Sequence, residues 1–188
     1  MTVAIAHWQF SVTDYARMRD YGLLAEDDRV ELIDGEVRHM SPIGSRHMAM
    51  VNRLSRLITL RLGESGIVSV QNPVRLDNYN EPQPDLAVLA WRDDDYVNLT
   101  PAATDVLLLI EVADSSLDYD RNEKLPRYAA AGVPEVWLVD LVHQIVEQHT
   151  EPRADHYHVV RLCEHGDLLR AEQAAAVVIA VERLFAVG

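Results

Sequence analysis

The run Val106–Ala113 reads Val-Leu-Leu-Leu-Ile-Glu-Val-Ala, and Glu111 is its only charged residue. A continuous apolar run of this length is typical of a strand buried on both faces near the centre of a sheet. Such a strand needs helices on both faces, so the run predicts an α/β fold. A buried carboxylate without a partner is costly or has a raised pKa, so Glu111 needs a compensating partner, and a hard cation is a natural one. The alternative is that Glu111 lies at the solvent end of the strand, which the nearby Asp114 favours.

The other segments alternate between helical and strand-like patterns. The segment 45–62 is the clearest helix, because apolar residues recur at a spacing of three to four positions along it. Asp34-Gly35 between two strand-like segments predicts a hairpin turn. The expected elements are a helix at 11–24, strands at 29–33 and 36–40, the helix at 45–62, strands at 68–76, 85–91 and 106–113, a helix at 121–131, a strand at 135–140, and a hairpin of 144–150 with 156–163. This order suits a mixed sheet with helices packed on it, and residues 164–188 stay ambiguous.

Composition limits the class of protein. With 188 residues, 48% of them hydrophobic and 25% charged, the chain suits one domain spanning residues 1–188. No apolar run approaches the roughly 18 residues that a membrane helix needs, and the first residues lack the pattern of a signal peptide. Cys163 is the only cysteine, so no internal disulfide can form. We therefore expect a cytoplasmic protein that does not cross a membrane.

A second carboxylate, Asp85, follows Pro84 and opens another apolar segment. If this strand and the strand of Glu111 meet at one edge of the sheet, the two carboxylates converge there. Two like charges are costly together unless a cation lies between them, and a divalent metal ion bound by oxygen atoms meets that need. Lys124, on the following element, is the single lysine in a chain whose other basic residues are all arginine. Lysine is a compact charge with a tunable pKa, which makes Lys124 a candidate for chemistry.

These residues resemble a known family. Pro84-Asp85, Glu111-Val112-Ala113 and the segment 120–124 resemble the PD-(D/E)XK nucleases. A closer resemblance is to the Uma-two family of restriction endonucleases, and it is carried by Glu31-Leu32-Ile33-Asp34-Gly35-Glu36, by Met40-Ser41-Pro42, by His47 and by the segment 128–140. Together these motifs span most of the chain, from about Tyr15 to Val160.

The resemblance implies a restriction-endonuclease-like fold, with a mixed central sheet flanked by helices and with an N-terminal helix and hairpin. It implies a metal-dependent endonuclease that hydrolyses DNA, in which Asp85, Glu111 and the backbone carbonyl of Val112 hold Mg²⁺ or Mn²⁺. The usual lysine of the superfamily lies two residues after the glutamate, where this chain has Ala113. The Uma-two group resembles a variant with the lysine on the following helix, so Lys124 would orient or deprotonate the attacking water.

Three further residues are weaker catalytic candidates. His47 lies near the apolar stripe of the 45–62 helix, where a core role is the commoner one, but the resemblance brings this helix near the metal site. Glu31 and Glu36 lie on paired strands, where a structural role is at least as common. Pro126, two residues after Lys124, predicts that the helix starts near Lys124, because proline is tolerated only in the first turn.

The net charge of −13 argues against passive nucleic-acid binding, which needs basic residues to neutralise phosphates. The chain therefore has two readings besides the nuclease: a binding or regulatory protein that keeps the fold without catalysis, and, more weakly, a metal enzyme acting on another phosphate or small substrate. The nuclease predicts a basic groove over Asp85, to which arginines of the 45–62 helix could add, whereas the non-catalytic reading predicts an acidic or occluded rim. The 144–163 hairpin offers a surface for a homodimer.

Overall fold

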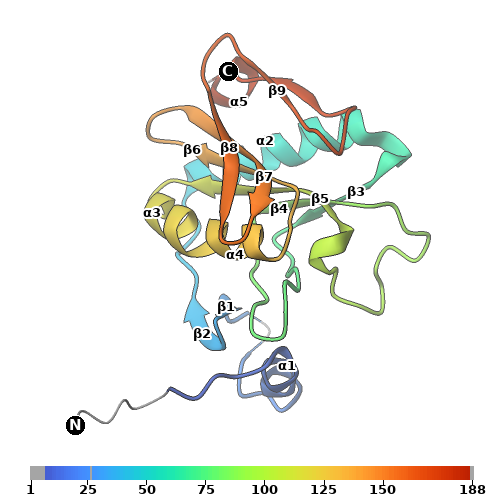
Figure 1. Cartoon of the computed structure of the whole chain (residues 1–188), viewed down its shortest axis with the longest axis vertical. Coiled ribbons are helices and arrows are strands. Elements are labelled where there is room, and N and C mark those ends of the chain that lie inside the picture. The colour runs from blue at the N-terminus through green and yellow to red at the C-terminus, as the bar shows by residue number, and fades with distance from the viewer. Residues whose placement is uncertain (1–6, 26, 187–188) are drawn as a thin grey trace.

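The computed structural model describes residues 7–25 and 27–186, and its centre is a six-stranded mixed sheet (Figure 1). The strand order is β3-β4-β5-β6-β7-β8, in which β5 and β6 are parallel and every other neighbouring pair is antiparallel. The strands are β3 Ile67–Val70, β4 Leu86–Leu89, β5 Val106–Ala113, β6 Glu135–Asp140, β7 Ile145–Arg153 and β8 His156–Cys163. The apolar run around Glu111 is thus a central strand, as its pattern predicted.

Helices cover both faces of the sheet (Figure 1). On one face, α2 packs Leu54 and Ile58 in the same cluster as Leu108 and Ile110 of β5. This cluster also takes in the C-terminal elements. On the other face, Tyr128 packs with Leu109 in a second cluster. The helical segments are α2 Ser45–Leu62 and the short η1 Gly63–Ser65, then η2 Ala103–Asp105, then α3 Leu117–Tyr119, η3 Asp120–Lys124 and α4 Leu125–Ala130 in succession, and the C-terminal elements are β9 Leu168–Arg170, β10 Val178–Ala180 and α5 Glu182–Phe185.

The N-terminal part forms a small unit of its own elements, which lies below α3 and α4 in Figure 1. It consists of α1 Val12–Asp20, β1 Val30–Ile33 and β2 Glu36–His39, with a hydrophobic cluster that includes Tyr15 and Leu32. Ser11 caps α1, and the helix ends at Asp20, before the predicted end at 24. The Asp34-Gly35 turn joins β1 to β2, and both residues have the positive φ that this tight turn needs.

The helix that carries Lys124 differs from the prediction. It begins at Leu117 rather than near Lys124, and it passes through a wide turn, η3, in which the amide of Leu125 donates to the carbonyl of Asp120. Such five-residue hydrogen bonding makes a π-type turn, which lets the helix continue into Pro126 without the usual four-residue bond. Lys124 therefore lies within a continuous helical segment and not at its start.

Other boundaries also shift. The strand predicted to reach residue 76 ends at Val70, since Gln71 has a φ of 52° and Pro73 follows. The β7–β8 turn is at Ala154-Asp155, later than the centre of the predicted loop. β8 is an edge strand with Leu162 exposed, and the homodimer through this hairpin stays a prediction for light scattering to test. No helix among the described residues is long and apolar enough to cross a membrane.

Candidate active site

The register of two antiparallel strands brings Asp85 and Glu111 together. Leu86 of β4 pairs with Ile110 of β5, so Asp85, one residue before β4, lies opposite Glu111. Side chains of directly opposite residues share one face of an antiparallel pair. The carboxylate of Asp85 also reaches across to β5, where its Oδ2 accepts the amide of Val112 at 2.8 Å. The two carboxylates thus meet at one edge of the sheet, as the strand argument required.

Glu111 is buried, with 3% of its surface exposed. Its Oε1 accepts two hydrogen bonds, from the ammonium of Lys124 at 3.2 Å and from the hydroxyl of Tyr128 at 2.5 Å. Burial raises the pKa of Glu111 well above its ordinary value, and the carboxylates of Asp120 and Asp85 raise it further, while Lys124 and Tyr128 oppose the rise. A raised pKa favours the protonated form of Glu111, so a cation beside it would have to offset the cost of its charge.

Lys124 is 4% exposed and lies between two carboxylates. Its Nζ is 3.2 Å from Oε1 of Glu111 and 3.2 Å from Oε2 of Glu31. Burial by itself lowers the pKa of Lys124, but attraction to Glu111, Glu31 and Asp120 outweighs burial and places the pKa above its ordinary value. Lys124 keeps its proton in this arrangement, so it offers a positive charge rather than a base.

Asp85 is held from three sides. Nε2 of His47, on the first turn of α2, is 3.0 Å from the Oδ2 that also accepts the Val112 amide, and the side-chain amide of Gln71 donates to Oδ1 at 3.3 Å. Since a carboxylate only accepts, Nε2 of His47 is the donor. Nδ1 of His47 is buried without a hydrogen-bond partner among the described residues. His47 thus orients Asp85 directly.

A pocket of about 440 Å³ opens onto these groups. Asp120 also faces it. Burial raises the pKa of Asp120 to about 6, and the hydroxyl of Ser116 donates to its carboxylate at 2.6 Å. The charged and histidine side chains that line the pocket are Arg29, Glu31, His39, His47, Asp85, Glu111, Asp114, Asp120 and Lys124.

The lining is acidic, since five carboxylates face only Arg29 and Lys124. Within the part of the chain that the structure describes, the pocket over Asp85 therefore lacks the basic walls that the nuclease reading predicted. Two arginines of α2 serve the fold instead: Arg53 donates to the carbonyl of Leu184, and Arg61 donates to the carbonyl of Val178 at 2.6 Å. These two arginines tie α2 to the C-terminal segment.

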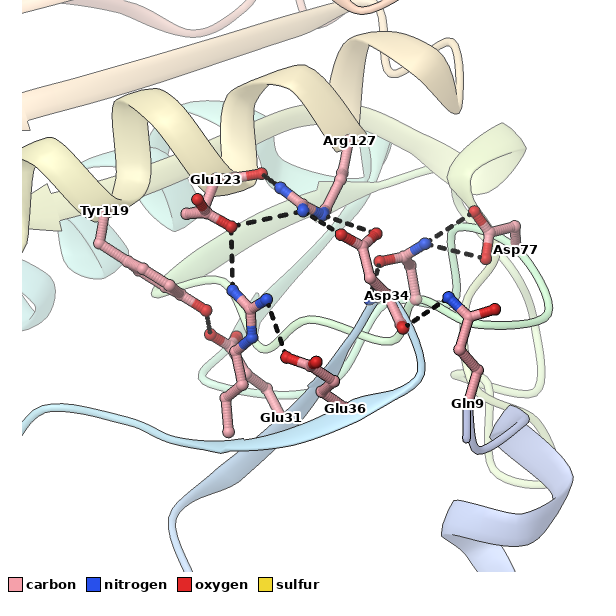
Figure 2. A network of polar contacts seen from close by, with 10 residues as sticks. Gln9, Glu31, Asp34, Glu36, Asp77, Tyr119, Glu123 and Arg127 are labelled. Carbon is pink, nitrogen blue, oxygen red and sulfur yellow. Dashed lines mark hydrogen bonds and ion pairs between the residues drawn. The ribbon is translucent and has the colours of Figure 1, made fainter. Parts of the chain in front are cut away.

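The other sequence candidates fall in different places. Glu31 lines the pocket, whereas Glu36 is exposed on β2, outside the pocket lining, and pairs with Arg38 at 3.2 Å. Sequence reasoning missed Tyr128, although it lies four positions after Lys124, which is the spacing of one helix face. It also missed Tyr119, whose hydroxyl donates to Glu31 at 3.0 Å and is shown in Figure 2.

The donors suit a hard divalent cation. Both hydrogen bonds that Glu111 accepts within the described residues go to Oε1, which leaves Oε2 for a ligand. The amide of Val112 faces Asp85, and in an extended strand the carbonyl of the same residue faces the same edge. Among residues 7–25 and 27–186, no three His, Cys, Asp or Glu side chains form a ready metal cluster. Mg²⁺ is commonly bound by one or two carboxylates with waters, so the fit rests on Asp85 and Glu111.

A family model described as "Putative restriction endonuclease", Uma2, matches residues 12–182. The chain belongs to the Uma2 family. It is also similar to a solved structure, described as a putative nuclease belonging to DUF820 from Anabaena variabilis ATCC 29413, with a TM-score of 0.75. The identity is 16%, over 94% of this chain and 97% of that one, so this likeness shows the mixed α/β fold. No curated protein matches the chain. The predicted family and fold are confirmed.

Proposed function

We propose that this Uma2 chain is a metal-dependent endonuclease that hydrolyses phosphodiester bonds of DNA. The observation that carries the proposal is the meeting of Asp85, Glu111 and Lys124 in one pocket, where β4 begins and β5 ends. The descriptions of the family and of the similar structure both name nucleases, which supports this class of reaction.

The side chains divide the work as follows. Asp85, Glu111 and the carbonyl of Val112 would hold Mg²⁺ or Mn²⁺. When bound, such a cation activates water for attack on phosphorus and offsets charge on the phosphate. Lys124 would hold an oxygen of the scissile phosphate through its ammonium group. In the overall reaction the oxygen of water bonds to phosphorus, the bond to the leaving oxygen breaks, and that oxygen takes up a proton.

Neighbouring groups would keep this arrangement in place. His47 and the Val112 amide orient Asp85, and Tyr128 orients Glu111. The start of α2 lines the same pocket through Gly44, and no side chain in the described part of the chain caps its first amides. Free amides at a helix N-terminus favour a phosphate group, which supports an anionic substrate despite the acidic walls.

The test is cleavage of plasmid, linear duplex and single-stranded DNA, with RNA alongside, in the presence of Mg²⁺ or Mn²⁺. We expect metal-dependent cutting by the wild type, loss of cutting in Asp85→Ala and Lys124→Ala, and unchanged cutting in Asp93→Ala, which removes an exposed carboxylate from another loop. If the wild type does not cut, and calorimetry shows no metal binding that depends on Asp85, the proposal fails.

The acidic lining favours a second candidate, a protein with the nuclease fold that binds a partner without catalysis. Five carboxylates around the pocket would repel a nucleic acid unless a cation intervened. For this candidate we expect no cutting and no effect of Mg²⁺ on the thermal unfolding midpoint. A midpoint that Mg²⁺ raises in the wild type but not in Asp85→Ala would contradict it.

A further inference from the structure

We propose that Glu31 is a positioning residue for Lys124, which it holds in place when a cation engages Glu111. The inference rests on the proposed function, because it concerns the same pocket. Its basis is the placement of the Lys124 ammonium, which is 3.2 Å from a carboxylate oxygen of Glu31 and 3.2 Å from one of Glu111. One lysine thus has two carboxylate partners, of which only Glu111 lies beside Asp85 on the central sheet.

Glu31 is buried and hydrogen-bonded at the place where it contacts Lys124. It is 2% exposed, and its carboxylate also accepts the hydroxyl of Tyr119 at 3.0 Å and the amide of Gln83 at 3.1 Å. Burying a carboxylate is costly unless it is both paired and hydrogen-bonded. Lys124 is the one basic side chain paired with Glu31 among the described residues. The carboxylate therefore depends on Lys124 for its charge partner.

A cation at Glu111 changes the balance around the lysine. The cation would repel the ammonium of Lys124 and would itself become the charge partner of the Glu111 carboxylate. With Glu31 beside it, Lys124 keeps a carboxylate partner and can stay in the pocket. Without that carboxylate, Glu111 would be the one ion-pair partner left to the ammonium among the described residues, and the ammonium would compete with the cation for it. Glu31 should therefore favour metal binding without being a ligand.

The hairpin that carries Glu31 is itself fixed to the helix of Lys124. Arg127 holds Asp34 at the hairpin turn, with Nε to Oδ1 at 3.0 Å, and Arg38 of β2 pairs with Glu123 at 2.9 Å. Figure 2 shows the contact between Arg127 and Asp34 together with the Tyr119–Glu31 bond. Because Glu123 and Arg127 lie on the same helical segment as Lys124, these contacts fix the position of the hairpin relative to the lysine.

A double-mutant cycle on Mn²⁺ affinity, measured by calorimetry on the full chain, tests the proposal. We expect Glu31→Gln to weaken Mn²⁺ binding roughly 10-fold, the effect of removing a group that supports a metal ligand. In a Lys124→Met background the same substitution should have little effect, because the lysine through which Glu31 acts is gone. A loss of equal size in both backgrounds would make Glu31 a direct ligand, and no loss in either would leave it without a role, so both results overturn the proposal.

The matched control is Glu135→Gln. Glu135 is also a buried carboxylate with several hydrogen-bond donors, but it contacts Trp137, Gln148 and the amide of Glu172 and does not line the pocket. Its substitution should leave Mn²⁺ affinity unchanged. Mn²⁺ binding by the wild type that Asp85→Ala does not remove would instead sink the proposed function.

The Lys124→Met variant leaves the buried carboxylates of Glu31 and Glu111 without their ion-pair partner, which threatens folding. A second measurement therefore uses neither this variant nor a metal. Lys124 is the only lysine, so the rate at which an amine-specific reagent such as acetic anhydride modifies it can be followed alone by peptide mapping. We expect Glu31→Gln to raise this rate several-fold and Glu135→Gln not to. Equal rates in the wild type and Glu31→Gln would overturn the positioning role, whatever the outcome of the cleavage assay.

Discussion

At the scale of the residue, two hydrogen-bond donors of different kinds fix the orientation of the Glu111 carboxylate. The ammonium of Lys124 supplies charge, and the hydroxyl of Tyr128 supplies direction from a fully buried position. A hydrogen bond to a charged group in a dry environment is stronger than one at the surface and holds its acceptor in one orientation. Glu111 can therefore present its other oxygen to a ligand without first rearranging.

Removing the hydroxyl of Tyr128 should change both the stability of the protein and its affinity for Mn²⁺. We expect Tyr128→Phe to lower stability by about 2 kcal/mol and to weaken Mn²⁺ binding roughly 10-fold. Urea unfolding and calorimetry measure the two effects. Tyr157→Phe is the control, since this tyrosine is also buried but donates to the carbonyl of Val133. If the two variants bound Mn²⁺ equally well, Tyr128 would have no special role at Glu111.

At the scale of the element, the turn of the β1–β2 hairpin is tight and closely packed. Gly35 has a φ of 72°, and its amide donates to the carbonyl of Tyr79 at 2.8 Å. A Cβ at this position would meet Cβ of Gln9 at 2.6 Å and Cα of Gln9 at 2.9 Å. The turn thus combines a left-handed backbone with close packing against another backbone, and it sets the place of the strand that carries Glu31.

Two glycines with similar backbone angles separate these contributions. We expect Gly35→Ala to lower stability by about 3 kcal/mol, from the left-handed backbone and the clash together. Gly22 has a φ of 69° but open space around it, so Gly22→Ala should cost only about 1 kcal/mol. Urea denaturation of both variants provides the comparison, and equal losses would show that packing at the hairpin turn contributes nothing.

At the scale of the whole molecule, the C-terminal segment completes the core on the α2 face. Ile179 and Leu184 belong to the same buried cluster as Leu54 of α2. Arg53 and Arg61 bind carbonyls of this segment, so polar contacts reinforce the apolar ones. Arg53 and Arg61 are thus committed to the fold, whereas Arg46 and Arg56 of the same helix are exposed.

The contribution of the C-terminal segment to stability can be measured by substituting two of its leucines. Leu184 is fully buried, and we expect Leu184→Ala to cost about 3 kcal/mol through the lost burial and the cavity left behind. Leu168 is 40% exposed, and Leu168→Ala should change stability by no more than about 0.5 kcal/mol. Thermal unfolding of both variants gives the comparison. A small loss for Leu184→Ala would mean that the C-terminal segment folds onto the sheet without stabilising it.

Local pattern by itself determined the elements whose burial is nearly uniform or strictly periodic. The central strand Val106–Ala113 and the helix Ser45–Leu62 have the bounds that the sequence predicts, because apolar periodicity depends on neighbours along the chain. Family motifs in the sequence also led to Asp85, Glu111 and Lys124 before any contact was known. These three residues lie in one pocket, and their chemical roles stay a proposal for cleavage and calorimetry to test.

Only the tertiary structure decided what those residues touch. The pairing of Lys124 with Glu31 joins positions far apart in the chain and depends on how the hairpin packs against the helix. The π-type turn before Pro126 places Lys124 inside a helix that local rules would have started later. The arginines of α2 look available for phosphates in the sequence, yet packing commits Arg53 and Arg61 to the C-terminal segment. Local sequence determines periodicity and propensity, whereas the partners of a charge are set by the packing of distant elements.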